Sequence, residues 1–123
     1  MSNQDALLKE LEDRYGLDCA NQARSLYEKH GDDIVIYPLG DGELLAIGWH
    51  EKAADEYNRM TNRMVEKAAD KAAAMSTFAL SFVVHPSREQ ARIIFKKLPA
   101  LATKVASKAQ ELCGSEIEEL GKA

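Results

Sequence analysis

The sequence is poor in the residues that build covalent or metal-bound frameworks. Two cysteines, Cys19 and Cys113, occur among 123 residues, far apart and without a CxxC pair or a neighbouring histidine. Neither a disulfide framework nor a zinc module has a basis in this pattern. We interpret both cysteines as reduced thiols that pack as small apolar side chains.

The chain also lacks an excess of positive charge and any long apolar run. Sixteen Lys and Arg residues oppose twenty Asp and Glu residues, which gives a net charge of -4. Binding to phosphates needs the opposite balance, so we expect no nucleic-acid partner. No apolar run approaches the length of a membrane span, and Met1 to Glu10 lacks the apolar centre of a signal peptide. We therefore expect a cytoplasmic protein with no membrane partner.

What the chain does contain is enough apolar surface to form a core. Apolar residues make up 46% and charged residues 29%, the balance of a globular protein. A chain of this length can bury most of its apolar side chains in one core. We expect a single domain over residues 1–123, made of an N-terminal helix pair at 5–30, a hairpin at 33–49 and a helical body at 51–120.

The N-terminal region shows two helical patterns separated by a glycine. Apolar residues at three- and four-residue steps predict a first helix over 5–15, which ends at Gly16. Asp18 is expected to cap a second helix that ends near Gly31.

The period of the apolar residues then changes to that of strands. Apolar runs at 34–37 and 44–47 flank an Asp41-Gly42 pair, which is the strongest short signal for a hairpin turn. This hairpin is the one β element that the sequence predicts.

The remainder of the chain indicates helices. An apolar stripe runs from Ala53 to Ala73, and residues 74–84 are apolar on almost all sides, which is typical of a buried helix. His85-Pro86 should interrupt it, and Ser87 with Gln90 forms a capping box for a helix that runs to about Leu98.

Two further helices are expected at the C-terminal end. Pro99 suits the first turn of a helix that ends at Gly114, and Ser115 with Glu118 predicts a short tail helix. The fold class is therefore mainly α (α+β), with five to six helices and one hairpin.

No residue set has the spacing that catalysis or metal binding requires. His30, His50 and His85 have no carboxylate or thiol at ligand spacing, and no nucleophile elbow such as GxSxG occurs. We expect no enzyme activity, no metal and no cofactor. An enzyme of unrecognised type would need His50, His85 and acidic pairs such as Asp32-Asp33 to converge in one cleft.

Two groups of residues are candidates for binding a partner. Arg88, Arg92 and Lys96 are spaced one helical turn apart in a region with few acidic residues, and they suit an acidic protein surface. A solvated helix face is the alternative. Ile117 and Leu120 would form an apolar face at the C-terminal end, with docking onto the protein's own core as the alternative.

Several short motifs between Glu43 and Gly114 resemble those of one family. They are the segment from Gly48-Trp49-His50-Glu51 to Tyr57, Val83-Val84-His85-Pro86, Leu98-Pro99-Ala100-Leu101-Ala102 and Glu111-Leu112-Cys113-Gly114. The order of these motifs resembles the tail assembly chaperones of long-tailed bacteriophages and prophages. The sequence departs from that family at Ser81-Phe82, where a cysteine often stands before the Val-Val pair.

The resemblance implies binding to the long helical tape measure protein before the tail tube assembles around it. It also implies absence from the mature virion, and a longer product made by ribosomal slippage near Leu120-Gly121-Lys122. A small chaperone for an extended client is expected to form a homo-oligomer or to bind in many copies. The other hypothesis is a small acidic inhibitor or immunity-type protein that binds one protein partner.

Overall fold

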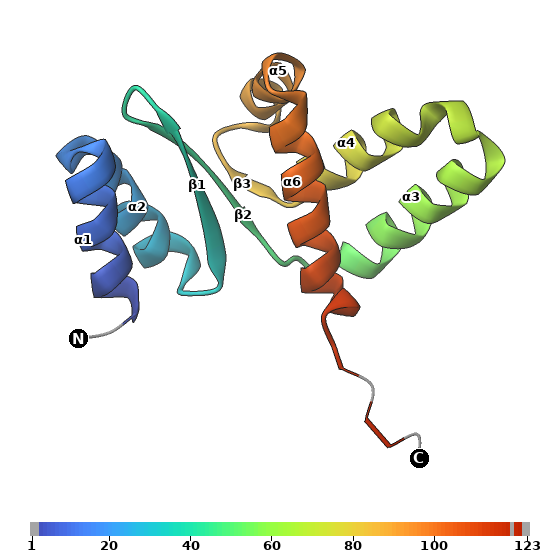
Figure 1. The fold of residues 1–123 in the computed structure, drawn as a ribbon, viewed down its shortest axis with the longest axis horizontal. Coiled ribbons are helices and arrows are strands. Elements are labelled where there is room, and N and C mark those ends of the chain that lie inside the picture. Colours follow the sequence, from blue (N-terminus) through green and yellow to red (C-terminus); the bar gives the residue numbers. More distant parts are fainter. Residues whose placement is uncertain (1–2, 119, 122–123) are drawn as a thin grey trace. The chain divides into compact units, whose positions relative to one another are not determined.

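The computed structural model describes residues 3–118, 120 and 121. Within these residues it contains six α-helices and a three-stranded antiparallel sheet (Figure 1). The mainly α fold class with one hairpin is confirmed. No helix in the described ranges is long and apolar enough to cross a membrane.

The chain divides into two compact units. The first comprises the described part of Met1–Gly48 together with Val83–Ile93, and the second comprises Trp49–Phe82 and the described part of Ile94–Ala123. The family-like motifs therefore fall mainly in the second unit, and the N-terminal helix pair belongs to the first.

The first unit packs a helix pair against one face of a hairpin. Its elements are α1 (Asn3–Tyr15), α2 (Leu17–His30), β1 (Ile34–Gly40), β2 (Glu43–Gly48) and β3 (Val83–His85). The buried residues of the helices meet Ile34 and Ile36 of β1 and Leu44 and Ala46 of β2. These four positions alternate along their strands, so they share one face of the sheet. Both N-terminal helices are confirmed within two residues of their predicted ends.

The start of α2 differs from the prediction in one detail. Gly16, with φ 97°, stands at the N-cap, and Asp18 lies within the first turn without capping it. Gly16 can adopt this left-handed conformation because it has no Cβ. Asp18 still favours the helix, since a carboxylate in the first turn interacts with the positive end of the helix dipole.

The predicted hairpin turn is confirmed. Asp41 and Gly42 connect β1 and β2 with φ 51° and 77°, the two positive values of a type I′ turn. The Gln22 side-chain amide donates a hydrogen bond of 2.6 Å to the Gly42 carbonyl oxygen, which ties the turn to α2.

Sequence reasoning missed a third strand. β3 pairs antiparallel with β2, with Ala46 opposite His85 and Ile47 opposite Val83. The prediction that residues 74–84 form one buried helix is therefore wrong at its end. Two β-branched valines favour a strand, and Pro86 keeps His85 out of the helical region. Three residues are too few to show the alternation that identifies a strand in a sequence.

The second unit is helical. Its elements are α3 (Ala53–Glu66), a 3-10 turn η1 (Ala68–Asp70), α4 (Lys71–Ser81), the end of α5 (Arg88–Lys97), α6 (Pro99–Gln110) and a wider helical turn η2 (Glu111–Ser115). The apolar stripe from Ala53 to Ala73 is not one helix, because the backbone leaves the helical region at Lys67. α3 and α4 instead form a helical hairpin (Figure 1).

Aromatic rings form the centre of this unit. Phe78 and Phe82 are buried, and their ring centroids lie 5.1 Å apart in an edge-on arrangement. The ring centroids of Tyr57 and Phe78 lie 6.0 Å apart, and those of His50 and Phe82 lie 4.7 Å apart. On α6 the buried positions are Ala102, Val105, Ala106 and Ala109.

The predicted helix starts after residue 86 are confirmed, but the predicted tail helix is not. The Gln90 backbone N–H donates to the Ser87 hydroxyl oxygen at 3.3 Å, and Pro99 opens α6. Gly114, inside η2, adopts φ 105°, and beyond η2 the described residues 116–118, 120 and 121 are not helical. So short a segment does not repay helix nucleation without a packing partner. Lys122, part of the slippage prediction, lies outside the described residues.

Candidate functional site

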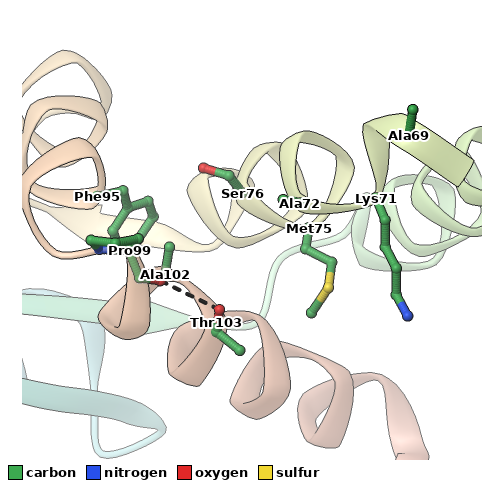
Figure 2. A pocket seen from close by; sticks show the side chains of 9 residues that line it. All are labelled: Ala69, Lys71, Ala72, Met75, Ser76, Phe95, Pro99, Ala102 and Thr103. Atoms are coloured by element: carbon green, nitrogen blue, oxygen red, sulfur yellow. Dashed lines mark hydrogen bonds between the residues drawn. The ribbon is translucent and has the colours of Figure 1, made fainter.

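An open groove lies between α4 and α6 in the second unit. It has a volume of about 510 Å³, within the range of roughly 300–1,000 Å³ that is typical of ligand sites. It is lined by Ala69, Lys71, Ala72, Met75, Ser76, Phe95, Pro99, Ala102 and Thr103. Figure 2 shows Met75 and Lys71 extending from the α4 wall, with Phe95 and Pro99 on the opposite wall.

Several of the residues that line the groove are small. Ala69 and Ala72 on one wall and Ala102 on the other bear only a methyl group, and Pro99 carries a compact ring. Longer side chains at these positions would fill the space between the helices. Larger apolar side chains, the half-buried Met75 and the buried Phe95, supply much of the apolar lining.

The polar groups of the groove are few. The Thr103 hydroxyl donates a hydrogen bond of 3.3 Å to the Pro99 carbonyl oxygen, within its own helix (Figure 2). Lys71 is the only charged residue in the lining, and no Asp or Glu of the described chain lines the groove. The groove therefore suits an apolar ligand that carries negative charge at its edge.

The described lining offers few reactive groups. It contains hydroxyl groups at Ser76 and Thr103 but no histidine or carboxylate that could act as a base beside them. No group of three or more His, Cys, Asp or Glu residues in the described ranges could hold a metal ion. A methionine adds an adaptable contact, because its unbranched side chain adjusts to different ligand shapes.

The surroundings of His50 and His85 include no carboxylate among the contacts described here. His50 Nδ1 accepts the backbone N–H of Lys52 at 3.2 Å, and its Nε2 is buried without a hydrogen-bond partner in the part of the chain that is described. The pKa of His85 lies below its usual value because the side chain is partly buried and because His30 and Lys29 are close to it. The charged neighbours that lower this pKa are bases, not carboxylates.

The cysteines also have elevated pKa values. Burial raises the pKa of both the Cys19 and the Cys113 thiol, and Cys19 lies in the core of the first unit. The Cys113 thiol donates a weak hydrogen bond of 3.8 Å to the Ala53 carbonyl oxygen. Both cysteines are free, and a thiol with a raised pKa is a poor nucleophile near neutral pH.

The five residues predicted to bind a partner do not line the groove. Arg88, Arg92 and Lys96 are exposed on α5, and none of them forms an ion pair within the described residues. Ile117 and Leu120 are 81% and 84% exposed. The structure leaves their roles as predictions.

Sequence reasoning missed the groove itself. The signal was present as small residues at Ala69 and Ala72 and at Pro99 and Ala102. That signal gains meaning only when α4 and α6 are known to be neighbours. Periodicity gives the buried side of each helix, but it does not say which helices face each other.

Comparisons with known proteins give one similar structure and one family. A structure of an uncharacterised protein, RBSTP2171 from Bacillus stearothermophilus, is similar with a TM-score of 0.57 and 20% identity over 80% of this chain and 98% of that chain. This likeness shows a shared fold. No curated protein matches the sequence. The family model described as domain of unknown function DUF6848 matches residues 49–120, which hold every residue of the groove. The chain belongs to the DUF6848 family.

Proposed function

We propose that this protein is a phage tail assembly chaperone that binds helical segments of the tape measure protein in the groove between α4 and α6. The observation that carries the proposal is an open apolar groove within the segment that the family model matches. An amphipathic helix can lay its apolar residues into such a groove, with anchors spaced three or four positions apart.

One of the motifs that resemble tail assembly chaperones lines this groove. The Leu98-Pro99-Ala100-Leu101-Ala102 motif supplies Pro99 and Ala102 to one wall. A second motif supplies His50 and Tyr57. The ring of Tyr57 packs on Phe78 of α4, and the ring of His50 packs on Phe82 at the end of α4. The motifs are thus consistent with a helical scaffold that keeps the groove open.

The mode of binding fits a client that would otherwise aggregate. A tape measure protein is a long helical molecule, and its apolar stripe needs cover until the tail tube forms around it. One groove covers only a short part of such a rod, so several copies are required per client. Each copy binds the client with modest affinity, and many copies together cover a long stretch of its apolar surface.

Co-expression with the tape measure protein of the same phage or prophage tests the proposal. The chaperone should move the tape measure protein from the insoluble to the soluble fraction and co-purify with it. Ala72→Glu places a carboxylate at an exposed helix position in the groove. Binding of the client would bury this charge against apolar side chains, so the variant should bind the client about tenfold or more weakly.

Ala73→Glu is the matched control. Ala73 is also exposed on α4 but does not line the groove, so this variant should keep the client soluble. Equal loss in both variants would contradict the groove as the binding site. Recovery of a small compact protein in place of a long helical one would favour the inhibitor hypothesis over the chaperone.

A further inference from the structure

The C-terminal segment presents apolar side chains that have no cover. Ile117 and Leu120 are among the most exposed large apolar residues of the described chain. Gly114, with φ 105°, leaves the helical conformation inside η2, and the Ile117 N–H donates to the Gly114 carbonyl oxygen at 3.1 Å. The segment after this bond is not helical where it is described.

The same segment has the sequence of an amphipathic helix. Ser115 and Glu118 match a capping box, and Ile117 and Leu120 are three residues apart, so one helical turn would place both on one face. A surface that packs against this face would supply the stabilisation that the isolated segment lacks.

The charges of the tail complement those of the groove. Glu116 and Glu118 flank Ile117 and are exposed, whereas the groove carries Lys71 and no carboxylate from the described residues. A short acidic helix with two apolar residues is therefore the kind of ligand that the groove suits.

We propose that the C-terminal segment, residues 115–121, of one copy docks in the α4–α6 groove of a second copy. Ile117 and Leu120 enter the groove, and the glutamates lie toward Lys71. Two such contacts, related by a two-fold axis, form a reciprocal dimer in which each copy provides one segment and one groove. It goes beyond the proposed function, because the segment of the second copy and the client would compete for the same groove.

The geometry of α6 explains why the groove belongs to a second copy. Thr103, the groove residue of α6 nearest to Gly114, lies eleven residues before it, a distance of about 16 Å along a helix. Ile117 lies three residues after Gly114 and reaches at most about 11 Å from it. Leu120 could span the distance only in an extended segment, which would leave Ile117 outside the groove.

Two variants of the full-length protein test the contact, and each of them removes one of its two sides. Ile117→Asp with Leu120→Asp changes exposed positions of the segment, and Ala72→Glu blocks the groove. Sedimentation equilibrium should show a dimer for the unmodified protein and an increase of about tenfold or more in the dissociation constant of each variant. Ala73→Glu should dimerise like the unmodified protein.

Mixing the two variants tests the tail-to-groove contact directly. The Ala72→Glu chain keeps a working segment, and the doubly substituted chain keeps a working groove. A one-to-one mixture should therefore form a heterodimer, held by one contact instead of two and weaker than the unmodified dimer. Neither variant should dimerise alone at the same concentration.

Three results would overturn the proposal. The first is a monomer at all concentrations for the unmodified protein. The second is a dimer that both variants leave unchanged. The third is loss of dimerisation in both variants without heterodimer formation on mixing, which would indicate a different interface. Client binding by a monomeric protein would leave the proposed function intact, and dimerisation without client binding would leave this contact intact.

Discussion

The N-terminal helix pair and the α4–α6 pair both present apolar stripes, but they use them differently. In the first unit, the stripes of α1 and α2 close against each other and against the hairpin, and Ala23 has no exposed surface. In the second unit, small residues leave the space between α4 and α6 unfilled on one side, and Ala72 remains exposed in an open groove. Alanine thus allows close packing in the first unit and leaves an open groove in the second, depending on the side chains opposite it.

This contrast separates a role in folding from a role in binding. A closed core gains stability from complete burial, and any change in volume there costs free energy. An open groove gives up part of that burial, and the apolar surface that remains is available to a partner. Substitutions should therefore affect mainly stability in the first case and mainly binding in the second.

The largest expected effect comes from the buried side of α4. Phe78→Ala removes a ring that packs on both Phe82 and Tyr57, and it should lower the free energy of unfolding by about 3–5 kcal/mol. Met75→Ala, three residues earlier and facing the groove, should cost far less because Met75 is only half-buried. Urea denaturation of both variants measures the difference, and equal losses would mean that the groove side is as tightly packed as the core.

An intermediate effect is expected from adding volume to matched alanines. Ala23→Leu enlarges a fully buried side chain and should destabilise the protein by about 1–3 kcal/mol. Ala72→Leu adds the same atoms to the exposed groove wall and should change stability by less than about 0.5 kcal/mol. Thermal denaturation can compare the two. A large destabilisation by Ala72→Leu would show that the groove has no room for added side chains.

The smallest expected effect is a pH dependence in the first unit. The pKa of His85 is lowered in the folded protein by burial and by His30 and Lys29, so the unfolded chain binds the proton more tightly. The stability due to neutral His85 is complete above its ordinary pKa near 6.5 and is lost as the pH falls toward the lowered folded value. Urea midpoints between about pH 5 and pH 8 should show this loss.

His85→Gln is the variant that isolates the His85 contribution, because it removes the proton-binding ring at this position. It should flatten the pH dependence in this window. His30→Gln should reduce the dependence only in part, since Lys29 and burial still act on His85. An unchanged slope in His85→Gln would assign the pH dependence to another group.

Much of the fold followed from local signals in the sequence. The apolar spacing gave both N-terminal helices, Asp41-Gly42 gave the hairpin turn, and Ser87 and Pro99 marked two helix starts. Each of these signals acts within a few residues, through a cap, a turn conformation or one helix face. Such features are accessible to sequence reasoning because they do not depend on distant neighbours.

The features that were missed depend on distant neighbours. The stripe from Ala53 to Ala73 continues in phase across Lys67, so periodicity did not reveal the break between α3 and α4. Val83–His85 forms a strand because β2 lies beside it. The tail carries a capping sequence, but its described residues are not helical, and Ile117 and Leu120 are exposed. The groove requires α4 and α6 to meet.

Methyl NMR can show directly whether the α4–α6 groove is the binding surface. The methyl groups of Met75, Ala72 and Ala73 would be observed while a helical fragment of the tape measure protein is added. We expect large shifts at Met75 and Ala72, which line the groove, and small ones at Ala73. Unchanged Met75 and Ala72 signals, with shifts confined to residues around Arg88 and Arg92 on α5, would contradict it.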